Sequence, residues 1–81
     1  MTLRLFARAR EAAGTGNDHF DAATVGELLA QAVSRYGAEF ADVLATSRVW
    51  VNGDEPAAGD DTQLRQGDEV AVLPPVSGGS R

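Results

Sequence analysis

The fold of this chain is decided by the stretch Thr24-Val25-Gly26-Glu27-Leu28-Leu29-Ala30-Gln31-Ala32-Val33-Ser34-Arg35-Tyr36-Gly37. Thr24 and Glu27 have the spacing of a capping box, in which the hydroxyl accepts from a free backbone N–H of the first turn and the carboxylate reaches back to the N–H of Thr24. Gly37 can end the helix in a left-handed conformation. An apolar stripe at helical spacing is formed by Val25, Leu28, Leu29, Ala32, Val33 and Tyr36. The stretch therefore predicts an amphipathic helix that builds the core.

Apolar and polar residues alternate in short segments on both sides of this helix, as they do in strands that bury one face. The predicted strands are residues 2–7, 19–21, 48–52 and 69–73, with a further short strand at 62–65 around the core anchor Leu64. The pair Asn52-Gly53 predicts a tight hairpin turn.

Two connecting segments also carry structural signals. Residues 8–14 are rich in helix formers and end in a glycine, so they predict a short helical turn. Residues 38–46 predict an irregular or short helical connection that is anchored in the core by Phe40, Val43 and Leu44.

The order strand, strand, helix, strand, short strand, strand predicts an α+β domain with a mixed sheet of four to five strands and one main helix on one face. We expect the first and last strands to pair in the centre, because Leu3 and Leu5 present the same apolar face as Val70 and Val72. This is the pattern of a β-grasp, the ubiquitin-like fold. The domain is expected to span residues 1–73, followed by an extended tail at residues 74–81 that contains Gly-Gly.

Composition excludes several classes of function. With 81 residues the chain is one domain. It has no cysteine and a single histidine, so neither a metal site built from cysteine or histidine nor a catalytic triad is expected. The net charge of −5 argues against nucleic acid and anionic membrane as partners and favours a partner with a basic face. No apolar run approaches the ~20 residues that cross a bilayer, and no signal peptide is recognised, so we expect a cytoplasmic protein without an autonomous active site.

Three short motifs follow one another along the chain. Residues 6–14 read Phe-Ala-Arg-Ala-Arg-Glu-Ala-Ala-Gly, and residues 51–53 read Val-Asn-Gly. Residues 67–79 read Gly-Asp-Glu-Val-Ala-Val-Leu-Pro-Pro-Val-Ser-Gly-Gly, the most specific of the three. Together and in this order, the three motifs resemble those of the MoaD/ThiS sulfur-carrier family. The arm at 6–14 and the Pro-Pro pair are more similar to the small subunit of molybdopterin synthase than to the thiamine-pathway carrier.

The resemblance implies a sulfur carrier that acts in molybdenum cofactor biosynthesis. A ubiquitin-activating-like enzyme would use ATP to adenylate the carboxylate of Gly79, which then becomes a thiocarboxylate. The carrier would insert its tail into the large subunit of molybdopterin synthase and give its sulfur to a pterin precursor. The chain itself would bind no cofactor.

The tail has the physical properties that such a role needs. Glycine has no Cβ, so the walls of a narrow channel can close on bare backbone. The two prolines fix their φ angles and favour an extended stem, and six residues span roughly 20 Å at about 3.3–3.6 Å each. The residues expected to meet a partner's channel are Leu73, Pro74, Pro75, Val76, Ser77 and Gly78.

Ser80 and Arg81 follow the glycine pair, so the carboxylate of Gly79 is not free as written. Three explanations remain open: a peptidase trims the tail, the two residues are foreign to the natural protein, or the chain is not a carrier. A chain ending at Arg81 should be inert as a sulfur donor.

Phe6, Trp50 and Leu73 are predicted to lie on the face of the sheet opposite the helix. They form either a docking surface for partners or a minor core beneath the arm at 8–14. Arg10 either makes a salt bridge to a partner or is solvated. His19 is expected at the surface, without a ligand or catalytic role.

Two other functions stay open. A carrier of the same mechanism could deliver sulfur for cysteine, thiamine or a secondary metabolite, or modify proteins. A β-grasp interaction module would use the glycines only as a flexible end.

Overall fold

Four strands form one mixed sheet in the order β2-β1-β4-β3 in the computed structural model, which describes residues 1–75. The strands are β1 (Thr2–Leu5), β2 (Asn17–His19), β3 (Arg48–Val51) and β4 (Glu69–Leu73). The central pair β1 and β4 is parallel, with Leu3 beside Val70 and Leu5 beside Val72, and the two outer pairs are antiparallel. The predicted central pairing of the first and last strands is therefore confirmed.

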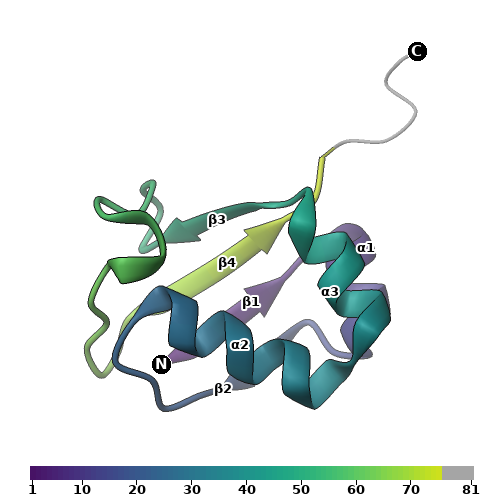
Figure 1. The fold of residues 1–81 in the computed structure, drawn as a ribbon, viewed down its shortest axis with the longest axis horizontal. Coiled ribbons are helices and arrows are strands. Elements are labelled where there is room, and N and C mark those ends of the chain that lie inside the picture. The colour runs from purple at the N-terminus through teal and green to yellow at the C-terminus, as the bar shows by residue number, and fades with distance from the viewer. Residues whose placement is uncertain (76–81) are drawn as a thin grey trace.

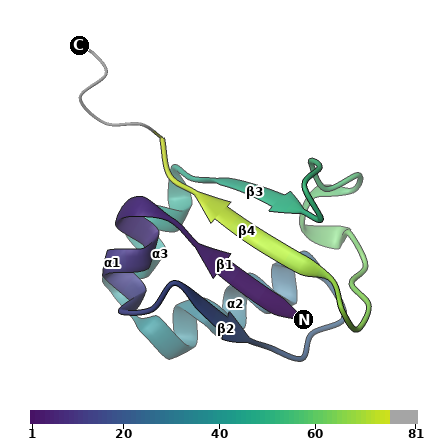
Figure 2. The ribbon, with the colours of Figure 1, turned by 180° about the vertical axis from the view of Figure 1, so that it is seen from behind.

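The helices lie on one side and at one end of the sheet. They are α1 (Ala7–Ala13), α2 (Val25–Tyr36), α3 (Ala38–Ala45) and the 3₁₀ helix η1 (Gly59–Asp61). In Figure 1, α2 and α3 lie in front of the strands, and in Figure 2 the opposite face of the sheet is turned to the viewer with no helix across it. Within residues 1–75, no helix combines the length and the apolar character needed to span a bilayer. The sheet thus has one covered face and one open face.

The core lies between the sheet and α2, α3 and α1. Its buried members are Leu3, Leu5, Ala9, Phe20, Ala22, Val25, Leu28, Ala32, Phe40, Val43, Leu64, Val70 and Val72. Leu28 and Phe40 have no exposed surface, and burial of a side chain of this size stabilises the fold by about 1.5–3 kcal/mol. The predicted helix therefore does build the core, and Phe40, Val43 and Leu64 are confirmed as anchors.

Both ends of α2 differ in detail from the prediction. The Thr24 hydroxyl accepts a hydrogen bond from the Glu27 N–H at 3.2 Å, as expected. The Glu27 carboxylate accepts from the N–H of Ala23 at 2.9 Å, one residue before the predicted donor. Gly37 has φ 104° and ψ −171°, which is not the left-handed helical conformation, because this residue also precedes α3 and must turn the chain directly into the next helix.

The second strand lies earlier than predicted. We expected residues 19–21, but β2 pairs Asn17, Asp18 and His19 with β1. Because β1 begins at Thr2, which lies opposite His19, there is no strand residue for Asp21 to pair with. Phe20 instead packs into the core.

The predicted short strand at residues 62–65 does not form in the described part of the chain. Gln63 makes one isolated bridge to Thr24, and Leu64 anchors the segment. The Asn52-Gly53 turn is present: Val51 and Asp54 exchange backbone hydrogen bonds of 2.7 and 3.0 Å across it. No ladder follows this turn: Val51 and Asp54 form one isolated bridge, and the ladder of β3 is made with β4.

Candidate functional site

The open face of the sheet carries an apolar hollow of about 430 Å³. It is lined by Phe6, Trp50, Gly53, Glu69, Ala71 and Leu73. Phe6 is 40% exposed and is the large apolar side chain that stands out on the described surface. Trp50 of β3 lies beside Ala71 of β4 in the antiparallel register, and both are half-buried. The structure therefore brings together Phe6, Trp50 and Leu73, as the strand alternation predicted. Their role in docking stays a prediction.

The junction between β1 and α1 places Phe6 beside the end of β4. The Phe6 N–H donates to the carbonyl of Val72 at 3.3 Å, and the backbone of Phe6 is extended. Ala7 then has φ 49°, in the left-handed region, which costs a non-glycine residue roughly 1–2 kcal/mol. This sharp turn sends α1 back against α3, and Ala9 enters the main core. The alternative that the arm at 8–14 covers Phe6, Trp50 and Leu73 is therefore wrong.

One ion pair crosses the open face. Arg4 Nη1 lies 3.3 Å from Glu69 Oε2, and the Arg4 guanidinium carbon is 6.0 Å from the centre of the Phe6 ring. Both charged side chains are about half exposed, so the pair itself adds little to stability. It does hold the charge of Arg4 at the edge of the hollow and leaves the centre apolar.

The turn after β3 is clamped to the beginning of β4 by Asn52. Its side-chain oxygen accepts from the Glu69 N–H at 2.9 Å, and its amide donates to Asp68 at 3.1 Å. The backbone N–H of Arg65 and then the Asn52 amide hold the pKa of Asp68 below its usual value. The clamp fixes the register of β3 against β4, and so fixes where Trp50 stands.

The tail leaves the domain directly from this site. β4 ends at Leu73, and Pro74 and Pro75 continue the chain past the end of the sheet (Figure 1). A second hollow of about 540 Å³ lies at the base of the tail and is lined by Thr46, Arg48, Trp50, Leu73, Pro74 and Pro75. The predicted tail residues Val76, Ser77, Gly78 and Gly79, and the extension Ser80 and Arg81, lie outside the described residues.

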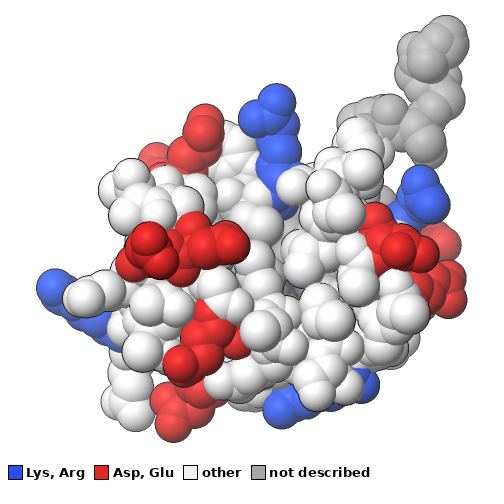
Figure 3. All heavy atoms as spheres, viewed as in Figure 1, with Lys and Arg blue, Asp and Glu red and all other residues white. Residues whose placement is uncertain are grey.

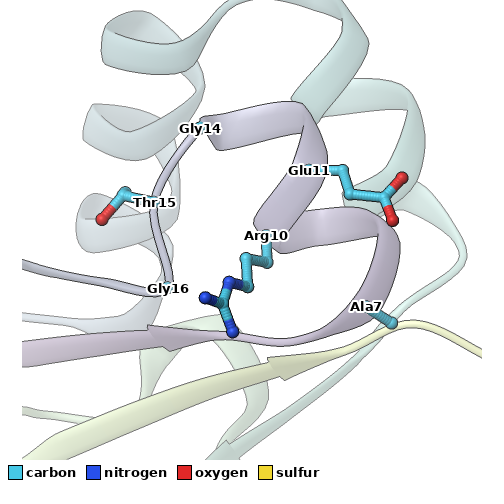
Figure 4. Close-up of a pocket in the computed structure, with 6 residues that line it drawn as sticks. All are labelled: Ala7, Arg10, Glu11, Gly14, Thr15 and Gly16. Atoms are coloured by element: carbon cyan, nitrogen blue, oxygen red, sulfur yellow. The ribbon is translucent and has the colours of Figure 1, made fainter.

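Arg10 belongs to a different hollow, of about 490 Å³, formed by α1 and the loop that follows it. Figure 4 shows its guanidinium pointing toward Gly16 and away from Glu11. Arg10 and Gly16 are in close contact, since a Cβ on Gly16 would lie 3.4 Å from Arg10 Nε. Within residues 1–75, Arg10 makes no salt bridge. The structure therefore does not bring Arg10 together with Phe6, Trp50 and Leu73.

Five residues that line the two hollows were missed from the sequence, namely Thr46, Arg48, Gly53, Glu69 and Ala71. Ala71 could have been found, because it lies two residues from Leu73 in a strand whose alternation was recognised. Arg48 could have been found in the same way from Trp50. Thr46 could not, because its position depends on where α3 ends and how the chain enters β3.

Figure 3 shows the charges on the helix side of the molecule. Acidic side chains gather in several groups around a largely uncharged surface, and among the coloured residues of this face the basic side chains are scattered singly. This distribution accords with the net charge of −5.

Residues 3–79 match the model of the ThiS family. The chain is 38% identical over 77 residues to the molybdopterin synthase sulfur carrier subunit of Chlamydomonas reinhardtii, covering 91% of this chain and 92% of that protein. Among solved structures it is similar to the small archaeal modifier protein 1 of Haloferax volcanii, with 34% identity, a TM-score of 0.82, and 96% and 97% of the two chains covered. It is also similar to a putative molybdopterin converting factor, subunit 1, from Pyrococcus furiosus, with 28% identity, a TM-score of 0.80, and 93% and 95% covered. These ubiquitin-like neighbours confirm the β-grasp fold.

Proposed function

This chain belongs to the ThiS family, and from that premise we propose that it is the sulfur carrier subunit of a molybdopterin synthase. Its reactive group is the carboxylate of Gly79, freed by removal of Ser80 and Arg81, and its partners are an adenylating enzyme of the ubiquitin-activating kind and the large synthase subunit. The observation that carries the proposal is the 38% identity to the Chlamydomonas carrier subunit over nearly the whole of both chains.

The family match supports Gly79 as the reacting residue. It ends at residue 79, so Gly78 and Gly79 fall inside it and Ser80 and Arg81 fall outside. Hydrolysis of the Gly79–Ser80 peptide bond by a peptidase consumes one water and exposes the required carboxylate. Without that step Gly79 has no free carboxylate, and a channel shaped for bare glycine backbone excludes the side chains of Ser80 and Arg81.

The proposed chemistry takes place in the partners. A carboxylate oxygen of Gly79 attacks the α-phosphorus of ATP, pyrophosphate leaves, and an acyl-adenylate forms. A hydrosulfide-equivalent nucleophile from the sulfur supply attacks the carbonyl carbon and displaces AMP, which gives the thiocarboxylate. When that sulfur is transferred to the acceptor, water attacks the carbonyl carbon of Gly79 and supplies the oxygen that replaces it, which returns the carboxylate. ATP is bound by the activating enzyme, and this chain supplies the acyl group and no cofactor site.

The described part of the molecule contributes recognition. Phe6, Trp50 and Leu73 present an apolar surface at the root of the tail, and clusters of exposed apolar side chains on a small domain are typical of partner-binding sites. Because β4 lies in the centre of the sheet and continues directly into Pro74, a partner that grips this face also sets the direction of the tail. Two prolines lower the entropy lost when the tail is inserted, which is of order 1–2 kcal/mol for each residue fixed.

A second function is favoured by a separate observation. Two neighbours of high structural similarity are small archaeal modifier proteins, from Haloferax volcanii and Methanosarcina acetivorans, at 34% and 29% identity. A protein modifier would use the same activation of Gly79 and then form an amide with an amine of a target protein. The two functions differ only in the acceptor.

The test compares the full chain with a version that ends at Gly79. Each is incubated with the adenylating enzyme, ATP and a sulfide source, and its intact mass is measured. We expect replacement of one oxygen by sulfur in the Gly79-ended chain and no change in the full chain. Equal modification of both, or of neither, would contradict the proposal. Adding the large synthase subunit and its pterin precursor, or a lysine-bearing target, then separates the carrier from the modifier.

A further inference from the structure

Two hollows meet at the root of the tail. The apolar hollow on the open face and the hollow at the tail base share Trp50 and Leu73 as lining residues. Leu73 also lies directly opposite Arg48 in the register of β3 and β4. A partner that contacts Trp50 therefore also comes close to Arg48.

The hollow at the tail base carries a charge of the opposite sign to the net charge of the chain. The chain carries a net charge of −5, yet Arg48 is the one charged residue among the described residues that line the hollow at the tail base. Arg4, which also lies on the open face, is paired with Glu69 at 3.3 Å. Arg48 is exposed and makes no salt bridge with any other residue of the range 1–75. Among the residues that the structure describes, the positive charge of this hollow therefore has no ion-pair partner.

The chemistry of this hollow defines what fits it. A guanidinium binds a carboxylate through two parallel N–H···O bonds, a geometry that an ammonium cannot reproduce. The indole of Trp50, the side chain of Leu73 and the rings of Pro74 and Pro75 supply apolar walls beside it. Exclusion of water by such walls strengthens a charge-assisted hydrogen bond. The hollow therefore suits an apolar side chain with a carboxylate next to it.

We propose that Arg48 determines partner specificity by binding an Asp or Glu side chain of the partner enzyme, next to an apolar residue that fills the hollow under Pro74 and Pro75. This inference rests on the proposed function, because it assumes that a partner engages the tail. It also changes the expectation, based on the net charge, that the partner has a basic face. In this proposal the part of the partner that contacts Arg48 is acidic. Basic groups of the partner lie farther from Arg48, opposite the acidic surface of this chain.

The experiment measures binding of the Gly79-ended chain to the purified large subunit of molybdopterin synthase, and to the adenylating enzyme, as a function of salt. Arg48→Glu is compared with Arg65→Glu. Arg65 is an exposed arginine that precedes β4, at the opposite end of that strand from the tail, so both variants change the net charge equally. Arg48→Lys keeps the charge and removes the planar fork. Far-UV circular dichroism and thermal unfolding establish that each variant is folded.

We expect Arg48→Glu to weaken binding to at least one of the two enzymes at least tenfold and to flatten the salt dependence of the association rate. Arg65→Glu should change affinity less than twofold, and Arg48→Lys should fall between wild type and Arg48→Glu. Equal effects of Arg48→Glu and Arg65→Glu, with normal wild-type binding, would overturn this inference alone. A wild-type chain that binds neither enzyme would overturn it together with the proposed function.

Discussion

The Tyr36 hydroxyl donates a 2.7 Å hydrogen bond to Asp18 Oδ2 and so joins the last turn of α2 to the edge strand β2. Arg35 Nη1 lies 3.0 Å from the same carboxylate oxygen, and the His19 N–H donates to the other oxygen at 2.8 Å. The Tyr36 ring packs edge-on against Phe20 and Phe40. One carboxylate thus fastens the shortest strand of the sheet to the helix that builds the core.

This arrangement predicts how stability depends on acid. The hydrogen bond from Tyr36, then that from the His19 N–H and the contact with Arg35, lower the pKa of Asp18 to about 2. A carboxyl whose pKa is depressed on folding stabilises the protein above its unfolded value near 3.8, and this contribution is lost as the pH falls toward 2. Since Asp18 is partly exposed, we expect this contribution to the free energy of unfolding to be about 1 kcal/mol.

Denaturant unfolding of wild type, Asp18→Asn and Tyr36→Phe between pH 2 and pH 7 checks this prediction. Wild type should lose stability below about pH 4. Asp18→Asn should be less stable at neutral pH, and its free energy of unfolding should depend less on pH in the acid range. Tyr36→Phe should lose part of the same contribution. If the free energies of unfolding of wild type and Asp18→Asn fell equally with acid, a group other than Asp18 would govern the pH dependence of stability.

The core predicts a strong contrast between two neighbouring leucines of α2. Leu28 is fully buried and Leu29 only partly, although both belong to the apolar stripe. Leu28→Ala should lower the free energy of unfolding by about 2–5 kcal/mol, because it leaves a cavity in contact with both layers. Leu29→Ala should cost clearly less. Chemical denaturation of both variants measures the difference, and equal losses would mean that α2 is rotated from the position described.

Trp50 is predicted to contribute most of the binding energy of the open face. It lines both hollows at the root of the tail, so Trp50→Ala removes a wall from each. We expect an affinity loss of about 2 kcal/mol, roughly thirtyfold, for the synthase large subunit. Trp50→Phe should recover part of it. Titration calorimetry with the purified subunit gives both values, and an unchanged affinity of Trp50→Ala would remove the open face from the docking site.

Deletion of Gly78 and Gly79 distinguishes a carrier from a simple interaction module. In a carrier the deletion should abolish sulfur incorporation while the folded domain keeps its stability, because the buried core cluster is built from residues between Leu3 and Val72. A module that only binds should retain its affinity and its biological activity. The measurements are intact mass after incubation with the adenylating enzyme, and complementation of a strain that lacks the carrier.

The course of the chain through the helices and central strands could be read from local patterns. The apolar spacing of α2 and the matching faces of Leu3, Leu5, Val70 and Val72 identify which surfaces must meet, and the structure pairs them as expected. The errors lie where local signals compete. Asn52-Gly53 makes its turn, but the segment after it lacks the alternation that would hold a strand against β3. It forms one isolated bridge with Val51, and the ladder of β3 is made with β4.

The site was predictable only in part for a related reason. Alternation placed Phe6, Trp50 and Leu73 on one face, because side chains in a strand point to the two faces in turn. It did not reveal that the short arm folds away from this face. That depends on Ala7 adopting φ 49° and on the packing of α1 against α3, which involves residues about thirty positions apart.

The sequence by itself determined the class of the fold, the central pairing of its first and last strands, and the family, since periodicity and motifs are properties of neighbouring residues. Only the tertiary structure decided that the arm at 8–14 leaves this face uncovered and that, within residues 1–75, Arg48 at the base of the tail has no salt-bridge partner. Burial and ion pairing are decided by residues far apart in the chain, and their positions become fixed only when the layers pack.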